Sequence, residues 1–449
     1  MQNESTSPSA ALSRRQFLKT SSLAAASAAA VASFPSVLRA EGAQAIRAVI
    51  IGVGGRGGGA GVNFTEAVKM TGVDGKIVAV ADLFPEQARR GKENFSVPEE
   101  KCFSGFDAYR KALAEPDVNY VILATPPGFR SVQFRACVEA GKNVFMEKPV
   151  AVDGRGIRLM YETAALSKQK GLKVAAGTQR RHQASYIETI KRIHDGAIGD
   201  VVTLRAYWVN GGPIWHYGEG QSHYGQHVGD TDLEKQLNNW YHYIWLCGDH
   251  ICEQHVHNLD VCNWIMNDHP ARCWGQGSRQ QLGDKSGEIW DNFDVEYEYP
   301  NGVHLFSYCG QIKRDWSSVS EGVHGTSGSA DPHHMIRPKG GQVWRYRENE
   351  IDPYVQEHID LIHAITKDTE LNEASQVTDS TLTAIMGREA SYSGAGVSRE
   401  DILNCKFTYG PEQLYEDCSK MQFGSFRTLR PPMPSQHNIF SDPPMVPTV

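Results

Sequence analysis

The feature that most constrains the fold is a glycine-rich stretch between residues 46 and 61. An apolar run at 49–51 leads directly into Gly52-x-Gly54-x-x-Gly57, and a helical pattern follows. A strand that turns tightly into a helix beside a pyrophosphate has no room for a Cβ at the turn or at the phosphate contact. The helix start offers unpaired N–H groups to the phosphates. The residues expected to contact the cofactor are Gly52, Gly54, Gly55, Arg56 and Gly57.

A second strand supports this interpretation, since a glycine triplet alone can be a flexible connector. The buried-strand pattern at 76–81 ends in Asp82, at the distance where a ribose-binding carboxylate is expected. The three residues after Asp82 include no arginine for a 2′-phosphate. We therefore expect NAD rather than NADP.

Strand-like and helix-like patterns alternate from residue 45 to about 175. This alternation predicts an α/β fold with a parallel, doubly wound sheet of the Rossmann type. Thr125 and Pro126 follow the strand pattern that begins at Tyr120, at the sheet edge where ligands bind. They are candidate cofactor-lining residues, although a simple turn explains them almost as well.

Glu147-Lys148-Pro149 follows the strand pattern that begins at Asn143. Pro149 ends the strand because it lacks an N–H donor. Lys148 is therefore expected at the carboxyl edge of the sheet, near the nicotinamide, where a lysine can move a proton or hold a substrate hydroxyl. Taken alone, Lys148 is more readily explained as an ordinary surface lysine.

The stretch from 239 to 266 is rich in histidine and tryptophan. If Asp249 caps a helix, five side chains share one face: His250, Glu253, His257, Asp260 and Trp264. A histidine beside a carboxylate can be oriented to take a hydroxyl proton. Two alternatives are a zinc site that includes His255 and buried histidines satisfied by hydrogen bonds. The position of His255, about 100° or more around the helix, disfavours the zinc site, and no metal is expected.

Aromatic residues among many glycines fill the stretch 208–240, which includes Trp240. Such side chains suit the apolar faces and hydroxyl rims of sugars, although a self-packed insertion is an equal alternative. Three further residues follow the strand pattern at 173–177 and are expected to face the same cleft: Arg180, Arg181 and His182.

The two ends of the chain differ in composition from the region between them. Residues 13–19 contain a twin-arginine motif, followed by an alanine-rich stretch and a possible cleavage site near Ala40. This pattern predicts folded export to the periplasm without a stable membrane span, although an amphipathic disordered segment is an alternative. Residues 405–449 are proline-rich and predict an extended arm or a disordered tail.

Composition and length limit the classes of binding partner and the organisation of the chain. The net charge of −7 argues against nucleic acid. The 9 cysteines are scattered without a C-x-x-C pair, so no disulfide framework is expected. A length of 449 residues favours two domains.

The motifs together resemble the Gfo/Idh/MocA family of sugar and inositol oxidoreductases over roughly residues 45–400. The resemblance rests on the glycine loop, Asp82, the Thr-Pro-Pro turn, Glu147-Lys148-Pro149 and Gly177–His182. It implies a second α/β domain with an open, mostly antiparallel sheet, a homo-oligomer paired through that sheet, and Lys148 in the active site. The family pattern Asp-x₃-His-x₂-Asp corresponds to Glu253, His257 and Asp260, so the first carboxylate departs from the pattern.

We therefore expect a signal peptide at 1–40, an NAD-binding domain at 45–175, a substrate and oligomerisation domain at 176–404, and an arm at 405–449. The expected activity is hydride transfer between a sugar or cyclitol hydroxyl carbon and a tightly held NAD. His257 would be the base, Lys148 would hold the hydroxyl, and Glu253 and Asp260 would orient His257 or the substrate. The alternatives are a redox-neutral NAD-dependent glycosidase and a cofactor-loaded binding protein without turnover.

Overall fold

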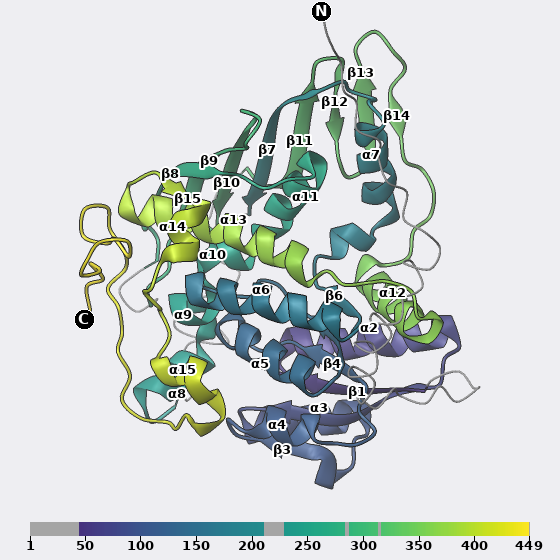
Figure 1. Cartoon of the computed structure of the whole chain (residues 1–449), viewed down its shortest axis with the longest axis vertical. Coiled ribbons are helices and arrows are strands. Elements are labelled where there is room, and N and C mark those ends of the chain that lie inside the picture. The colour runs from purple at the N-terminus through teal and green to yellow at the C-terminus, as the bar shows by residue number, and fades with distance from the viewer. Residues whose placement is uncertain (1–44, 211–228, 283–286, 313–315, 449) are drawn as a thin grey trace, which may run out of the picture. The chain divides into compact units, whose positions relative to one another are not determined.

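The computed structural model describes residues 45–210, 229–282, 287–312 and 316–448. Its first layer is a parallel sheet in the order β3-β2-β1-β4-β5-β6 (Figure 1). The strands are β1 (Ile46–Ile51), β2 (Gly75–Asp82), β3 (Cys102–Ser104), β4 (Tyr120–Leu123), β5 (Asn143–Met146) and β6 (Val174–Ala176). The helices between them are α2 (Gly55–Thr71), α3 (Pro85–Phe95), α4 (Ala108–Leu113), α5 (Pro127–Glu139) and α6 (Gly154–Gln169). The Rossmann-type expectation is confirmed.

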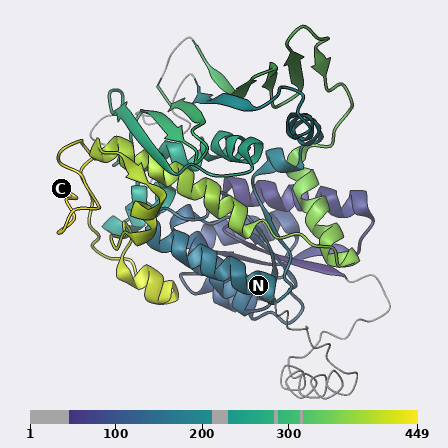
Figure 2. The same cartoon turned by 45° about the horizontal axis from the view of Figure 1, so that its top comes forward.

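A second sheet has the strand order β14-β13-β12-β11-β7-β10-β9-β8-β15. Every pairing in it is antiparallel except that between β7 and β10, as expected of an open, mostly antiparallel sheet. The strands are β7 (Val201–Val209), β8 (Arg272–Ser278), β9 (Asn292–Glu298), β10 (His304–Gly310), β11 (Ser318–Gly325), β12 (Gly328–Asp331), β13 (Met335–Pro338), β14 (Trp344–Arg345) and β15 (Val397–Ser398). Helices α11 (Val256–Met266) and α13 (Ala374–Ser393) pack on one face of this sheet (Figure 2).

Helix α12 (Pro353–Lys367) returns from the second half of the chain to the first sheet. Val355 and Ile362 join a buried cluster with Phe64 of α2. The hydroxyl of Tyr120 lies 2.7 Å from Nδ1 of His358. The core of the nucleotide-binding sheet is thus completed by residues far beyond 175.

The predicted continuous helix that Asp249 would cap is divided in the structure. Helix α10 spans Asp249–Glu253, and α11 begins at Val256. Asp249 has a positive φ of 70°, and the N-cap residue is Gly248, also with positive φ. Because the two helices are separate, the expected face shared by all five side chains does not form. Helix α5, expected from Ser131, begins at Pro127 because proline is well suited to a first turn.

The segment after residue 405 packs against the same chain. It contains α15 (Glu412–Asp417) and a short 3₁₀ turn, η4 (Cys418–Lys420), before an extended stretch with little regular structure. Tyr409 and His437 are buried in it. Within the described ranges, no helix has the length and apolar character that crossing a membrane requires.

Candidate functional site

A cavity of about 670 Å³ opens at the carboxyl edge of the parallel sheet. The predicted site residues that line it are Gly52, Gly54, Gly55, Arg56, Gly57, Asp82, Thr125, Pro126, Glu147, Lys148, Trp240, Glu253 and His257. They come from the ends of β1, β2, β4 and β5 and from the region of α10 and α11. Both halves of the chain therefore contribute to one cavity.

The glycine loop has the geometry of a phosphate cradle. Gly52 has φ +87°, and a Cβ there would lie 2.7 Å from the Thr125 backbone nitrogen. A Cβ on Gly57 would lie 1.8 Å from the Gly52 oxygen, so the helix can approach the strand only without a side chain. Helix α2 has no side-chain cap at Gly54, where a Cβ would point into open space. This uncapped helix start fits a dinucleotide pyrophosphate.

Asp82 stands beside the loop and accepts hydrogen bonds from two backbone N–H groups. The donors are Val53, at 2.7 Å, and Phe84, at 3.0 Å. Burial raises the pKa of Asp82, while these N–H groups act in the opposite direction. The carboxylate is held at the cavity wall, where it can accept ribose hydroxyls.

Arg56 connects the loop to two buried carboxylates. Its guanidinium forms an ion pair with Glu147 and lies 3.3 Å from Glu357 of α12. Burial raises the pKa of Glu357 well above its usual value, and the nearby Glu147 acts in the same direction. The ring of Tyr354 lies 4.8 Å from the Arg56 guanidinium carbon. Arg56 therefore neutralises carboxylates at the mouth of the loop in addition to facing the cavity.

Lys148 is buried, which removes the surface-lysine alternative. Its Nζ lies 3.0 Å from Oε2 of Glu253 and also donates to the Glu253 carbonyl oxygen. Burial raises the pKa of Glu253, and the Lys148 charge partly offsets this effect. The pair places an ammonium group at the cavity wall, directly beyond β5.

His257 lies in the same wall and stacks on Trp208, with ring centroids 5.7 Å apart. Burial lowers the pKa of His257 well below 6.5, and the positive charges of Lys148 and Arg180 act in the same direction. Among the described residues, its Nδ1 has no hydrogen-bond partner. His257 is therefore a neutral imidazole at neutral pH, able to accept a proton.

Asp260 does not line the cavity. Its carboxylate binds Arg181 at 2.9 Å and Ser380 at 2.7 Å, and Gln376 donates to it as well. The expectation that Asp260 orients His257 or the substrate is thus corrected. These three side chains take up the carboxylate, and Asp260 and Arg181 form a buried structural pair.

Arg180 and His182, like Arg181, lie outside the cavity lining, so the expectation that all three face the cleft is also corrected. Arg180 pairs with Glu321, which also accepts hydrogen bonds from Tyr186 and Asn258. His182 lies between two carboxylates, 2.6 Å from Asp360 and 3.3 Å from Glu373. Although burial opposes it, these carboxylates raise the pKa of His182 well above its usual value.

Several lining residues have no local sequence signal. Arg130 donates to the carbonyl oxygens of Thr125 and Pro149, and burial lowers its pKa to about 10. Gln133 accepts a hydrogen bond of 2.5 Å from the Thr125 hydroxyl. Only their position on α5, directly beyond the Thr-Pro-Pro turn, could have indicated them. Tyr354 arrives from α12 and could not be found without the fold.

Two further histidines of this region serve the core. His250 Nδ1 lies 3.2 Å from the Tyr241 hydroxyl, and His255 Nε2 lies 2.7 Å from the Ser307 hydroxyl. Across the described ranges, no three His, Cys, Asp or Glu side chains are grouped to hold a metal ion. Six aromatic and histidine residues of the expected sugar-binding loop lie outside the described residues: Trp215, His216, Tyr217, His223, Tyr224 and His227.

The parallel sheet and the site at its carboxyl edge define a Rossmann-type nucleotide-binding fold. Residues 46–177 match the family model described as "Oxidoreductase family, NAD-binding Rossmann fold". Residues 186–331 match the GFO/IDH/MocA C-terminal domain. Because these matches cover more than half of the chain, the protein belongs to the Gfo/Idh/MocA family.

Relatives and solved structures agree with this assignment. The chain is 27% identical over 218 residues to an inositol 2-dehydrogenase of Gluconacetobacter diazotrophicus, covering 48% of this chain and 55% of that one. It is 25% identical over 160 residues to a glycosyl hydrolase family 109 protein of Streptomyces coelicolor, covering 35% and 32%. The chain spans about half the length, or less, of the curated relatives it matches.

Among solved structures, scyllo-inositol dehydrogenase from Lactobacillus casei, with bound NAD(H) and scyllo-inositol, aligns with a TM-score of 0.61. The two proteins are 20% identical, and the alignment covers 79% of this chain and 99% of that chain. At this level of identity the likeness concerns the fold.

Proposed function

We propose that the protein is an NAD-dependent oxidoreductase that transfers hydride between a CH–OH carbon of a sugar or cyclitol and nicotinamide. The observation that carries this proposal is the single cavity shared by the phosphate cradle, the buried Lys148 and the neutral His257. The names of the inositol dehydrogenase relatives support a cyclitol or sugar as substrate.

The chemistry assigns a distinct task to each side chain. Bound nicotinamide supplies a hydride acceptor in one direction and a hydride donor in the other. His257 takes the hydroxyl proton on its imidazole ring, since its lowered pKa leaves it neutral at pH 7. Lys148 holds the substrate oxygen through its ammonium group and is itself positioned by Glu253. Asp82 accepts the adenosine ribose hydroxyls, and its negative charge disfavours a 2′-phosphate.

A second candidate is a redox-neutral glycosidase, which oxidises a ring carbon, eliminates the aglycone and reduces the ring again. The similarity to a glycosyl hydrolase family 109 protein supports this second candidate. Glu147-Lys148-Pro149 favours the dehydrogenase, because this motif resembles that of the dehydrogenases and Lys148 lines the cavity.

One experiment tests both candidates. The purified protein is denatured, released NAD(H) and NADP(H) are quantified, and the native protein is incubated with carbon-deuterated sugars and cyclitols. Transfer of deuterium to NAD, detected by mass spectrometry, supports the dehydrogenase. Release of phenol from aryl glycosides without net NADH formation supports the glycosidase instead. A protein that binds NAD but neither exchanges deuterium nor releases phenol contradicts both and leaves the binding-protein alternative.

We also propose that two copies pair through the open face of the second sheet. On this face, strands β8 and β10 expose Trp274 (41%), Phe306 (40%) and Tyr308 (38%). Sedimentation of the wild type and of a Phe306→Lys variant tests this pairing, since a charge there should dissociate the oligomer. A wild type that sediments as a monomer would contradict it.

Export through the twin-arginine pathway remains a proposal that rests on Arg14 and Arg15. Replacing both by lysine should leave the full chain in the cytoplasm, while the wild type reaches the periplasm. Equal periplasmic fractions of the two proteins would contradict it.

A further inference from the structure

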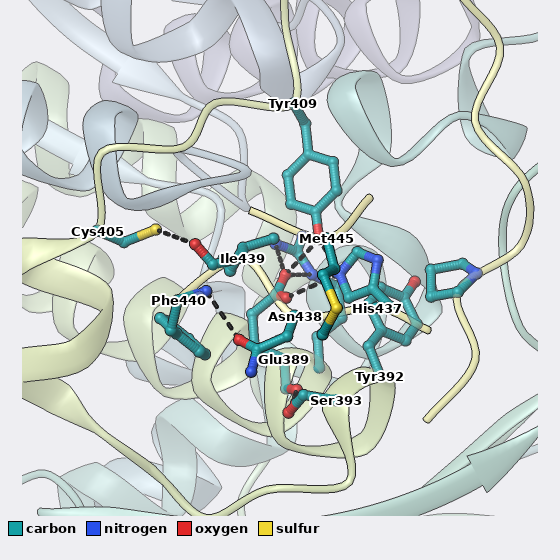
Figure 3. A network of polar contacts seen from close by, with 12 residues as sticks. Glu389, Tyr392, Ser393, Cys405, Tyr409, His437, Asn438, Ile439, Phe440 and Met445 are labelled. Atoms are coloured by element: carbon teal, nitrogen blue, oxygen red, sulfur yellow. Dashed lines mark hydrogen bonds and ion pairs between the residues drawn. The ribbon is translucent and has the colours of Figure 1, made fainter. Parts of the chain in front are cut away.

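Residues 410–436 form a loop whose two ends meet at one carboxylate. The Tyr409 hydroxyl donates to Oε1 of Glu389 at 2.8 Å, and His437 Nε2 lies 3.4 Å from Oε2 of the same residue (Figure 3). Tyr409 and His437 also contact each other at 3.0 Å. Arg388 forms an ion pair with Glu389, and both side chains are fully buried. The loop ends are therefore anchored in the protein interior.

The middle of this loop crosses the edge of the parallel sheet at α4. Asp417 forms a 3.0 Å ion pair with Arg110, and Cys418 Sγ lies 3.5 Å from the Tyr109 hydroxyl. Phe423 makes the next contacts along this loop. Phe423 stacks on Phe84 at 6.2 Å with an interplanar angle of 16°, and it packs against Phe106 at 5.3 Å.

The residues that Phe423 covers belong to one end of the cofactor cavity. Phe84 and Phe106 line it. Phe84 stands two residues beyond Asp82, whose carboxylate is placed for the ribose hydroxyls, and its N–H donates to that carboxylate. In a Rossmann domain the adenine continues outward from this ribose, so Phe84 and Phe106 form the wall that an adenine would meet.

The same loop also holds the opposite part of the cavity wall. Helix α8 (Asp232–Asn238) contributes Leu237 to the lining. The Leu233 N–H donates to the Gly424 carbonyl at 3.1 Å, and the Gln236 side chain donates to the Arg427 carbonyl at 2.9 Å. Residues directly after Phe423 thus bind α8, while Phe423 itself contacts the aromatic wall.

We propose that residues 410–436 are a strap that retains the dinucleotide, with Phe423 as the positioning residue that holds Phe84 and Phe106 against the adenine. This inference rests on the proposed NAD-dependent function. Departure of the adenosine requires the aromatic wall to move, and the strap opposes that movement because its ends are anchored at Glu389. The cofactor is then reoxidised or rereduced in place by a second substrate or within one cycle, instead of exchanging with free NAD.

The test measures cofactor dissociation directly, without turnover. Full-length mature protein is saturated with NADH, and the loss of its fluorescence is followed after mixing with excess NAD. Phe423→Ala should dissociate NADH about five- to hundredfold faster, the range expected from the loss of two aromatic contacts. Phe423→Tyr should restore slow release, because the stacked ring is kept. Met433→Ala is the matched control, since that side chain belongs to the same loop and is 54% exposed.

The outcomes separate the strap from the proposed function. Equal dissociation rates in the wild type, Phe423→Ala and Phe423→Tyr would overturn the strap while leaving NAD binding intact. If Phe423→Tyr releases NADH as fast as Phe423→Ala, the strap proposal is also overturned. The aromatic ring at this position would then not be what slows NADH release. A wild type that binds neither NAD nor NADH would overturn the proposed function and the strap together.

Discussion

Lys148 and Glu253 meet in a buried ion pair, with Nζ 3.0 Å from Oε2 and each side chain about 10% exposed. The pair joins the carboxyl end of β5 to the last residue of α10. Residues from two parts of the chain separated by about a hundred positions are thereby fixed at the same point of the cavity wall.

Replacing Lys148 by methionine should damage both activity and stability. Turnover should fall by roughly 10²- to 10⁴-fold if Lys148 holds the reacting oxygen. The Glu253 carboxylate would be left buried without its cation, at a cost of about 3 kcal/mol of unfolding free energy. Steady-state kinetics and urea unfolding measure the two effects. Lys111→Met, which removes an exposed partner of Asp107, is the control and should change neither. Turnover within a few-fold of the wild type would contradict the role of Lys148.

His257→Ala should abolish turnover while NAD remains bound, because the phosphate cradle is untouched. In the wild type, kcat/KM for alcohol oxidation should be constant above pH 6.5 and fall only at lower pH. The reason is that burial lowers the pKa of His257, so its base form persists below the usual value of 6.5. A pH–rate profile measured between pH 4 and 8 checks this expectation. An acid limb centred above pH 6.5 would exclude His257 as the base.

Two glycines of the phosphate loop should respond differently to alanine. A methyl group on Gly54 meets no atom within 4 Å, so the variant should fold normally but lose NAD affinity where the methyl occupies the pyrophosphate site. A methyl group on Gly57 would lie 1.8 Å from the Gly52 oxygen and should destabilise the fold by about 1–3 kcal/mol. Thermal unfolding and NAD titration separate these effects. If Gly54→Ala binds NAD as tightly as the wild type, the pyrophosphate does not bind against Gly54.

Asp260→Asn should lower stability and leave the chemistry almost unchanged. The carboxylate pairs with Arg181 in the interior, and removing its charge should cost about 1–3 kcal/mol of unfolding free energy. Because Asp260 is absent from the cavity wall, kcat should stay close to the wild-type value. Glu253→Gln is the comparison, since it alters a residue of the wall. A large loss of kcat in folded Asp260→Asn protein would restore its predicted role.

Stability should fall in mild acid through His255. Burial lowers its folded pKa from 6.5 to about 3, so the folded chain stays neutral there while the unfolded chain takes up a proton. The unfolding free energy contributed by His255 is fully present above pH 6.5 and decreases by about 2 kcal/mol at pH 5. His255→Gln should lose this part of the pH dependence in urea unfolding at pH 7.5 and 5. His324→Gln, at an exposed position, should keep it. Identical pH dependence in His255→Gln and the wild type would contradict the assignment.

The part of the site that the sequence predicts well consists of residues that directly follow strands. Gly52, Asp82, Thr125 and Lys148 each stand at the carboxyl end of a parallel strand, so recognising the strands is enough to bring them together. The expectation for Asp260 failed because its carboxylate is bound by Arg181, Gln376 and Ser380, which come from other parts of the chain. The break after Glu253, where α10 ends before α11 begins at Val256, is likewise not marked by residue spacing.

Residues contributed from distant segments were beyond sequence reasoning for a different reason. Tyr354 reaches the cavity only because α12 returns to the parallel sheet, and Phe423 reaches Phe84 only because the strap crosses α4. No periodicity or motif marks either approach. The proline-rich character of the last segment indicated an extended chain but could not indicate what it contacts.

The return of α12 to the first sheet has a consequence for biosynthesis. The apolar surface of α2 around Phe64 stays uncovered until residue 367 has left the ribosome, about 190 residues after β6. At a synthesis rate of about 5–20 residues per second, this delay lasts on the order of ten to forty seconds. Nascent chains stalled at residue 200 should therefore be cut by protease within the nucleotide-binding sheet, whereas chains stalled well beyond 367 should be protected there. The amino-terminal half of the protein matures only after its carboxyl-terminal half has been made.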